Sequence, residues 1–178
     1  YHKLITDGYQ QICFTNAYFN GKIDNIPEGI ISIIFNDNSI FNHSINSLPS
    51  SLKYLQLGWY FNQPIDNLPY SVTYLKLSPI FNRRIDKLPV GLTHLYLGQY
   101  FNKPVDKLPD TLTHLELKYR FNKPINNLPN SITHLKLGYH FNQSIDNLPS
   151  NLKYLYTGWN FNHPIDNLPS NLKVLYLN

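Results

Sequence analysis

The stretch FNKPINNLPNSITHLKLGYH, residues 121–140, sets the pattern for most of the chain. Its opening Phe-Asn pair recurs every 20 residues, and one earlier copy stands 22 residues before the next. Phe-Asn pairs begin at positions 19, 41, 61, 81, 101, 121, 141 and 161. A fixed period of this length is typical of a solenoid, in which each unit is one supersecondary turn that buries its apolar face only against its neighbours.

Each unit contains one short strand pattern. Apolar and polar residues alternate in Leu-x-x-Leu-x-Leu, residues 112–117, and the run is too short for a helix. Because the same order returns every 20 residues, the strands are expected to stack in parallel, about 4.8 Å apart. The Leu-Pro pair at 128–129 holds the return segment in an extended or turn conformation. We therefore predict a mainly β fold, a parallel β-solenoid with one strand per turn and little α-helix.

The apolar residues of a unit are expected to point inward and form one long core. For the turn that runs from the strand at 112–117 through the return segment to Pro129, these residues are Leu112, Leu115, Leu117, Phe121, Ile125 and Leu128.

Two polar columns accompany this core. The residue after each Phe is Asn in all eight copies, which predicts a buried ladder whose amides use both donor and acceptor to bridge successive turns. The ladder residues are Asn20, Asn42, Asn62, Asn82, Asn102, Asn122, Asn142 and Asn162. Four positions later the residue is Asp in six copies and Asn in two, which predicts an Asx-type cap on backbone N–H groups.

These motifs resemble those of FNIP repeats, a leucine-rich-repeat-like family. FNQPI at 61–65, FNKPI at 121–125 and FNHPI at 161–165 carry the resemblance, and FNHSI at 41–45 and FNRRI at 81–85 depart from it. FNIP repeats occur in F-box/FNIP repeat-containing proteins of social amoebae and giant DNA viruses. The resemblance implies a leucine-rich-repeat-like solenoid that serves as an interaction platform, with a role in substrate recruitment for a ubiquitin ligase if an F-box lies upstream.

The chain divides into two parts on this pattern. Residues 1–18 match the repeat poorly and are predicted to be an N-terminal cap or degenerate repeat, with Ile12 and Phe14 in a first strand. Residues 19–178 form the solenoid, whose units start at 19, 41, 61, 81, 101, 121, 141 and 161. No capping sequence follows the last strand pattern at 175–177, which leaves an open end for self-association.

The composition of the chain indicates its expected cellular location and argues against two classes of partner. A single cysteine, Cys13, excludes an internal disulfide and favours an intracellular location, in host cytoplasm or a virion. No signal peptide or long apolar run is visible, so we expect no membrane partner. The net charge is +4, but the basic residues are scattered among acids along the sequence, which argues against a nucleic-acid partner.

The outward positions of the strands are the predicted binding face. Aromatic, histidine and charged side chains gather there and just beyond the strands, as in protein-binding hot spots. The predicted partner-binding residues are Tyr54, Tyr74, His94, His114, His134 and Tyr154 in one column, Tyr96, Glu116, Lys136 and Tyr156 in the next, and Trp59 and Trp159 beyond them. Tyr60, Tyr100, Tyr119, Arg120, Tyr139 and His140 lie in the same region. The alternative is that these columns stack from strand to strand and only stabilise the sheet.

Other chemistry is less well supported. His94, His114 and His134 suggest a zinc site, but parallel strands hold the three imidazoles in too similar an orientation for tetrahedral coordination. The aspartate column suggests calcium sites, but Asn replaces Asp in two copies. We expect neither metal nor cofactor. No phosphate loop or nucleophile motif is present, so no enzyme is expected.

The sequence thus predicts a non-enzymatic protein–protein interaction scaffold that binds a partner protein on its sheet face. The alternative is a structural protein whose uncapped repeats assemble end to end into filaments.

Overall fold

The computed structural model describes residues 10–178, and each repeat in it contributes one short strand. In β3, β4, β5, β6 and β8 the middle residue is buried and its two neighbours are half-buried, as for Leu115 between His114 and Glu116 in β6. The strands are β1 (Gln11–Phe14), β2 (Ser32–Phe35), β3 (Tyr54–Gln56), β4 (Tyr74–Lys76), β5 (His94–Tyr96), β6 (His114–Glu116), β7 (His134–Lys136), β8 (Tyr154–Tyr156) and β9 (Val174–Tyr176).

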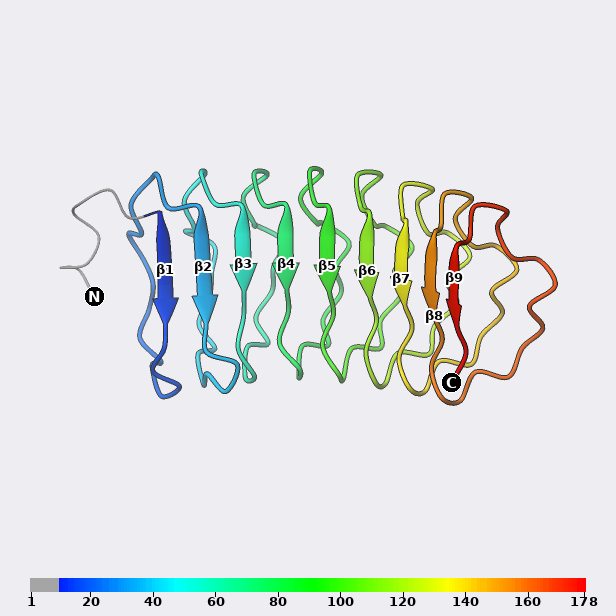
Figure 1. Ribbon diagram of the computed structural model, residues 1–178. Coiled ribbons are helices and arrows are strands. Elements are labelled where there is room, and N and C mark those ends of the chain that lie inside the picture. Colours follow the sequence, from blue (N-terminus) through cyan, green and yellow to red (C-terminus); the bar gives the residue numbers. More distant parts are fainter. Residues whose placement is uncertain (1–9) are drawn as a thin grey trace.

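All nine strands form one parallel sheet in chain order, from β1 to β9 (Figure 1). From β3 onward each residue pairs with the residue 20 positions later, as His94 does with His114. Between β2 and β3 the pairing shifts, and Ser32 lies opposite Tyr54. The two additional residues belong to the turn between Phe35 and Phe41, after β2.

The return segments consist of turns and bends. The Pro109 carbonyl accepts a hydrogen bond from the Leu112 N–H at 3.0 Å, and the Lys118 carbonyl accepts one from the Phe121 N–H at 3.0 Å. These two tight turns lead into and out of β6. Because residues 10–178 contain no helix, they contain no membrane-spanning helix either. The predicted mainly β, leucine-rich-repeat-like parallel solenoid is confirmed.

The core is one continuous apolar column between the sheet and the return segments. The six predicted inward residues, from Leu112 to Leu128, are all buried. Phenylalanine rings stack along it, with ring centroids 6.2 Å apart between Phe101 and Phe121 and again between Phe121 and Phe141. Full burial of a phenylalanine side chain contributes about 1.5–3 kcal/mol to the free energy of folding. The apolar groups that bury each ring come from the neighbouring turns.

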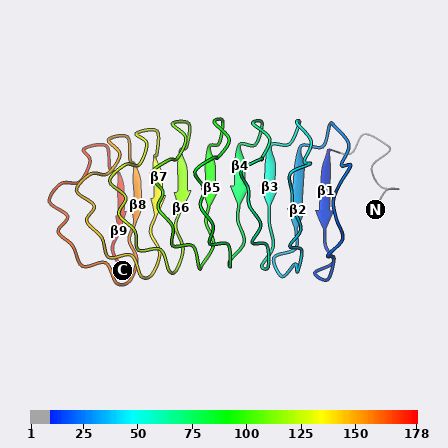
Figure 2. The same cartoon turned by 180° about the vertical axis from the view of Figure 1, so that it is seen from behind.

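The solenoid curves with its sheet on the inner side. On the outward face of the sheet, the ring centroids of His114 and His134 are 4.0 Å apart. In the core of the same two repeats, toward the return segments, the ring centroids of Phe121 and Phe141 are 6.2 Å apart. Rungs that are closer together on the outward face of the sheet than in the core require a concave sheet. The views from both sides agree, since the return segments near the C-terminal end spread wider than β8 and β9 (Figures 1 and 2).

The first described turn continues the same construction. Strand β1 contains Ile12 and Phe14, the residues predicted to form a degenerate first strand, and pairs with β2. The Phe14 ring stacks on Phe35 with centroids 4.4 Å apart, so the aromatic column reaches this turn. The predicted cap over 1–18 lies partly outside the described residues.

The asparagine column connects successive turns, but it differs from the prediction in two respects. From Asn20 to Asn142, the Oδ1 atom of each Asn accepts a hydrogen bond from the backbone N–H of the next Asn along the column, as between Asn122 and Asn142 at 2.9 Å. The predicted burial is wrong, because the eight side chains are half-buried or exposed. Their Nδ2 groups donate no hydrogen bond to another described residue, so the predicted need for a donor is not met. An aspartate could accept the same hydrogen bond, and Asp66, Asp86 and Asp106 stand in successive turns of the neighbouring column. Repulsion between carboxylates one rung apart is therefore a hypothesis for the choice of Asn, which the variants in the Discussion test.

The neighbouring Asp/Asn column also differs from the prediction. None of its side-chain oxygens accepts a hydrogen bond from a backbone N–H in residues 10–178, so the expected Asx-type caps are absent there. Asp86 instead pairs with the Arg84 guanidinium at 2.7 Å, which lowers the pKa of this carboxyl group. The backbone carbonyl of Ile65 supplies the turn acceptor for the Leu68 N–H, at 3.4 Å.

Candidate functional site

The first outward column of the sheet is a continuous stack of half-buried rings. It contains Tyr54, Tyr74, His94, His114, His134 and Tyr154. Centroids are 4.2 Å apart between His94 and His114 and 4.0 Å apart between His114 and His134. The widest step, between Tyr74 and His94, is 5.8 Å. Each ring covers the faces of its neighbours, so a partner on the concave side can reach mainly the ring edges.

Threonines fix the orientation of the three imidazoles. The Nδ1 atoms of His94 and His114 each lie 2.9 Å from the hydroxyl of the preceding threonine, and the Nδ1 of His134 lies 2.8 Å from the Thr133 hydroxyl. The imidazoles are thereby held parallel, and residues 10–178 bring together no group of three His, Cys, Asp or Glu side chains placed to hold a metal ion.

The three imidazoles of the stack are neutral at physiological pH. Burial, followed by the charges of His94 and His134, lowers the pKa of His114 from 6.5 to about 4. Burial also lowers the pKa values of His94 and His134 and, together with hydrogen bonding to Tyr54, raises the pKa of Tyr74. The protonated imidazole is disfavoured because it would be partly desolvated beside other imidazoles. The column therefore presents a polar but uncharged aromatic ridge.

The second outward column carries the charges of this face. Glu116 and Lys136 form an ion pair at 3.2 Å, and the rings of Tyr156 and Tyr176 stack with centroids 4.6 Å apart. A shallow pocket of about 130 Å³ lies between the two columns, with Tyr96, His134 and Tyr156 in its wall.

A groove follows the ends of the strands where the chain leaves the sheet. We call it the strand-end groove, and its repeating residues are Trp59, Pro79, Gln99, Tyr119, Tyr139 and Trp159. Its C-terminal part is a pocket of about 510 Å³ that Tyr156 and Lys118 also line. The side chains of Tyr119, Tyr139 and Trp159 are 48%, 41% and 66% exposed.

Three aromatic rings stand in a row along this groove. Centroids of Tyr119 and Tyr139 are 5.2 Å apart, and Tyr139 and Trp159 lie 6.4 Å apart with an interplanar angle of 2°. In the next position of the same turns, the Arg120 guanidinium lies 4.7 Å above the Tyr100 ring. Aromatic rings with exposed edges and faces beside charged groups suit the binding of a protein or peptide.

The structure separates the two tryptophans of the predicted binding face. Trp159 lines the large pocket, whereas the half-buried Trp59 lines a smaller one of about 240 Å³, five repeats away. Five rungs correspond to roughly 24 Å at the usual strand spacing. Asp37 also lines the smaller pocket and pairs with Lys76 at 3.0 Å.

Sequence reasoning identified both strand columns, but it did not single out the strand-end groove. Tyr119 and Tyr139 were placed only in the surrounding region, and Gln99, Lys118 and Asp37 were not considered. The period contained the missing signal, because Trp59, Tyr119, Tyr139 and Trp159 share one position of the repeat.

Comparison with known proteins agrees with this architecture. A family model described as the FNIP repeat matches residues 19–58, 41–79, 81–120, 104–140, 121–147 and 141–178. Among solved structures, the chain is similar to CroV588, which is described as a novel circular LRR protein. The TM-score is 0.71 at 39% sequence identity, over 90% of this chain and 29% of CroV588. The chain thus spans less than a third of that protein's length.

No curated protein matches the chain. The family match extends from residue 19 to residue 178 and includes every unit that starts with Phe-Asn. By its sequence motif and by its parallel solenoid, this chain belongs to the FNIP repeat family.

Proposed function

We propose that the chain is a non-enzymatic protein–protein interaction scaffold that holds a partner protein in the strand-end groove and against the adjoining concave sheet. The row formed by Tyr119, Tyr139 and Trp159 carries the proposal, because three large rings remain exposed in consecutive turns. Aromatic side chains dominate binding energy at protein interfaces. They stand here in tight turns directly after the strands and stack on each other, so little side-chain freedom is lost on binding.

The neighbouring charges favour one mode of binding. Lys118 lines the same pocket as the aromatic row, and the Glu116–Lys136 ion pair borders it. An extended segment that runs along the solenoid axis would place side chains against successive rings and polar groups on both edges. Repeat solenoids commonly bind extended partners in this way on their concave surfaces.

Replacement of the row by the residue of another copy tests the proposal. Gln99 occupies the same position one turn earlier, so Tyr119→Gln, Tyr139→Gln and Trp159→Gln are compatible with the repeat. Partners captured from a host lysate and identified by mass spectrometry should be depleted about tenfold or more with the triple variant. Tyr18→Ser, at an exposed position outside the groove, is the matched control. Equal recovery of every partner by wild type and triple variant would contradict the proposal.

A more specific role follows from the family if an F-box precedes the chain in the full-length protein. The strand-end groove would then select a substrate for a ubiquitin ligase inside the cell. The sequence encoded upstream of Tyr1 tests this role directly. A reading frame that continues without an F-box removes it and leaves the scaffold proposal intact.

Self-assembly is the second candidate. Every turn pairs in register with the next through short parallel strands, and an unpaired strand edge can accept a strand from another copy. The likeness to a protein described as circular also shows that such repeats can follow a long curved path. Light scattering coupled to size-exclusion chromatography and electron microscopy test for end-to-end filaments. A monomer at all concentrations would exclude them.

A further inference from the structure

The return side of the solenoid, opposite the concave sheet, contains two departures from the repeat. The first concerns the residue that follows each Leu-Pro pair. This residue is polar in five copies, namely Ser50, Asp110, Asn130, Ser150 and Ser170. The other two copies, which are adjacent, have Tyr70 and Val90, whose side chains are 82% and 69% exposed. An exposed apolar pair at a position that is otherwise polar has no role in the core.

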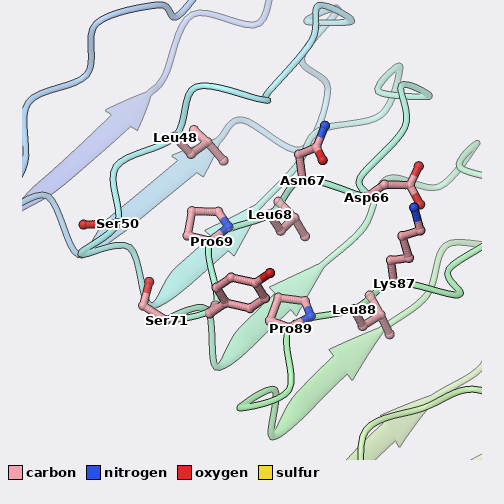
Figure 3. Close-up of a pocket in the computed structure, with 11 residues that line it drawn as sticks. Leu48, Ser50, Asp66, Asn67, Leu68, Pro69, Ser71, Lys87, Leu88 and Pro89 are labelled. Carbon is pink, nitrogen blue, oxygen red and sulfur yellow. The ribbon is translucent and has the colours of Figure 1, made fainter.

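A pocket of about 620 Å³ lies beside Tyr70, and Pro89, the residue before Val90, also lines it (Figure 3). Leu48, Leu68 and Leu88 from three successive turns lie along it, and Pro69 and Pro89 extend the apolar lining. Tyr70 also lines the pocket, and Asp66 and Lys87 lie at one side. A cavity of this size admits a large aromatic or aliphatic side chain.

The second departure is a cluster of cations on the same side. The position two residues after the Phe of each Phe-Asn pair is neutral or His in five of the eight copies. The position just before each Leu-Pro or Ile-Pro pair is neutral in six of the eight copies. In the turns that start at 81, 101 and 121 these positions instead hold Arg83, Lys103 and Lys123 and also Lys87 and Lys107. None of these five cations forms an ion pair with another residue of 10–178.

The two departures are contiguous. Lys87 lines the apolar pocket, and Lys107 follows it one turn further along the return side. Phenylalanine rings in these turns are 6.2–6.5 Å apart, which gives the rung spacing near the return side. Arg84 is neutralised by Asp86, so Asp106 and Asp110 are the remaining carboxylates of the return segments that bear the cluster. The surface is therefore an apolar pocket followed by a strip with excess positive charge.

We propose that this return surface docks an acidic peptide segment of a partner protein, which inserts one large apolar side chain into the pocket beside Tyr70. The acidic residues of the segment then lie along Lys87, Lys107 and Lys103. Charge complementarity identifies the occupant, because only an acidic chain matches the cationic strip and only an apolar anchor matches the pocket. A nucleic acid fits less well, since its phosphates would lie along the cations but would leave the apolar pocket unfilled.

The test uses fluorescence anisotropy with a labelled synthetic peptide, in which glutamates flank a single tryptophan. Replacement of the tryptophan by serine, or of the glutamates by glutamine, should each weaken binding about tenfold or more. Binding should also weaken as salt is raised, because the cations are exposed.

Variants that copy other repeats keep the fold comparable. Tyr70→Ser with Val90→Asn removes the apolar pair, and Lys87→Asn with Lys107→Asn removes two cations; each new residue occurs at the same position elsewhere in the chain. Both variants should weaken peptide binding about tenfold. Lys153→Thr with Lys173→Thr, which removes two cations from the sheet side, should leave binding unchanged. Circular dichroism and thermal unfolding verify that each variant is folded.

Three results would overturn the proposal. The first is that no binding is detected at millimolar peptide. The second is that the sheet-side control, Lys153→Thr with Lys173→Thr, weakens peptide binding as much as the return-side variants do. The third is that an oligothymidylate binds as tightly as the peptide and keeps this affinity in the Tyr70→Ser, Val90→Asn variant. The proposal is independent of the strand-end groove, because the Tyr119→Gln, Tyr139→Gln, Trp159→Gln variant should bind the acidic peptide normally.

Discussion

The imidazole rings of His114 and His134 lie face to face, with centroids 4.0 Å apart and planes inclined by 11°. The two residues are paired directly across β6 and β7. Parallel in-register strands place identical side chains one above the other, so these histidines contact each other instead of converging on a common ligand. The cross-strand stack also explains why their ionisation affects stability.

Stability should fall as the pH is lowered through the range in which the histidine stack resists protonation. The unfolded chain protonates His114 with the ordinary pKa of 6.5, whereas the folded chain does so only at about 4. Between these values the unfolded state binds more protons, so acid favours unfolding. Thermal unfolding followed by circular dichroism should give a lower Tm at pH 5 than at pH 7.

His114→Tyr is the matched variant, because Tyr74 and Tyr154 occupy the same column. It should reduce the dependence of Tm on pH over this interval. An unchanged pH dependence in the variant would show that the histidine stack does not cause the acid sensitivity.

Asn122→Ala should destabilise the solenoid by about 1 kcal/mol, because the backbone N–H of Asn142 loses its acceptor. Asn122→Asp retains an acceptor oxygen and should cost less. Simultaneous Asn102→Asp, Asn122→Asp and Asn142→Asp should cost more than the sum of the single changes, since three carboxylates would then lie one rung apart. Urea unfolding measures each free energy. Additive costs would refute charge repulsion as the reason for asparagine.

Gly158→Ala should destabilise the fold strongly, by about 2 kcal/mol or more, because a Cβ atom there would overlap the backbone carbonyl of Gly138 in the preceding turn. Gly91→Ala is the control, since its nearest non-neighbouring atom would be the Tyr70 carbonyl oxygen at 3.6 Å. Thermal unfolding should therefore separate the two variants. Equal Tm values would mean that the turns can move apart at Gly158 without loss of packing.

Phe101→Ala should lower the free energy of unfolding by about 3–5 kcal/mol, because it opens a cavity in the ring column between Phe81 and Phe121. Tyr60→Ala, at an exposed position, should change it by less than about 0.5 kcal/mol. Urea unfolding of both variants measures the difference. A small effect at Phe101 would indicate that the turns on either side close the cavity.

Most of the fold could be predicted from the sequence, and the candidate site could be predicted only in part. The inward positions of Leu115 and Phe121 follow from the alternation of the strand and from the period, because every copy repeats the same apolar positions. The partial exposure of Asn122 did not follow, since an invariant amide is compatible with either a buried or a surface ladder. Trp59 and Trp159 occupy equivalent positions in the repeat but line different pockets, because five turns separate them.

The sequence by itself determined the parallel stack, its register, its core residues and its family, because a constant period brings equivalent atoms of every turn together. Tertiary structure decided which outward side chains remain accessible. Curvature brings the rings of His114 and its neighbours close enough to cover each other, while the strand-end groove leaves Tyr139 and Trp159 open. The tertiary structure also brings Tyr70, Lys87 and Lys107, which lie in separate turns, together on the return side of the solenoid. Exposure depends on distances between turns, and only the folded coil sets those distances.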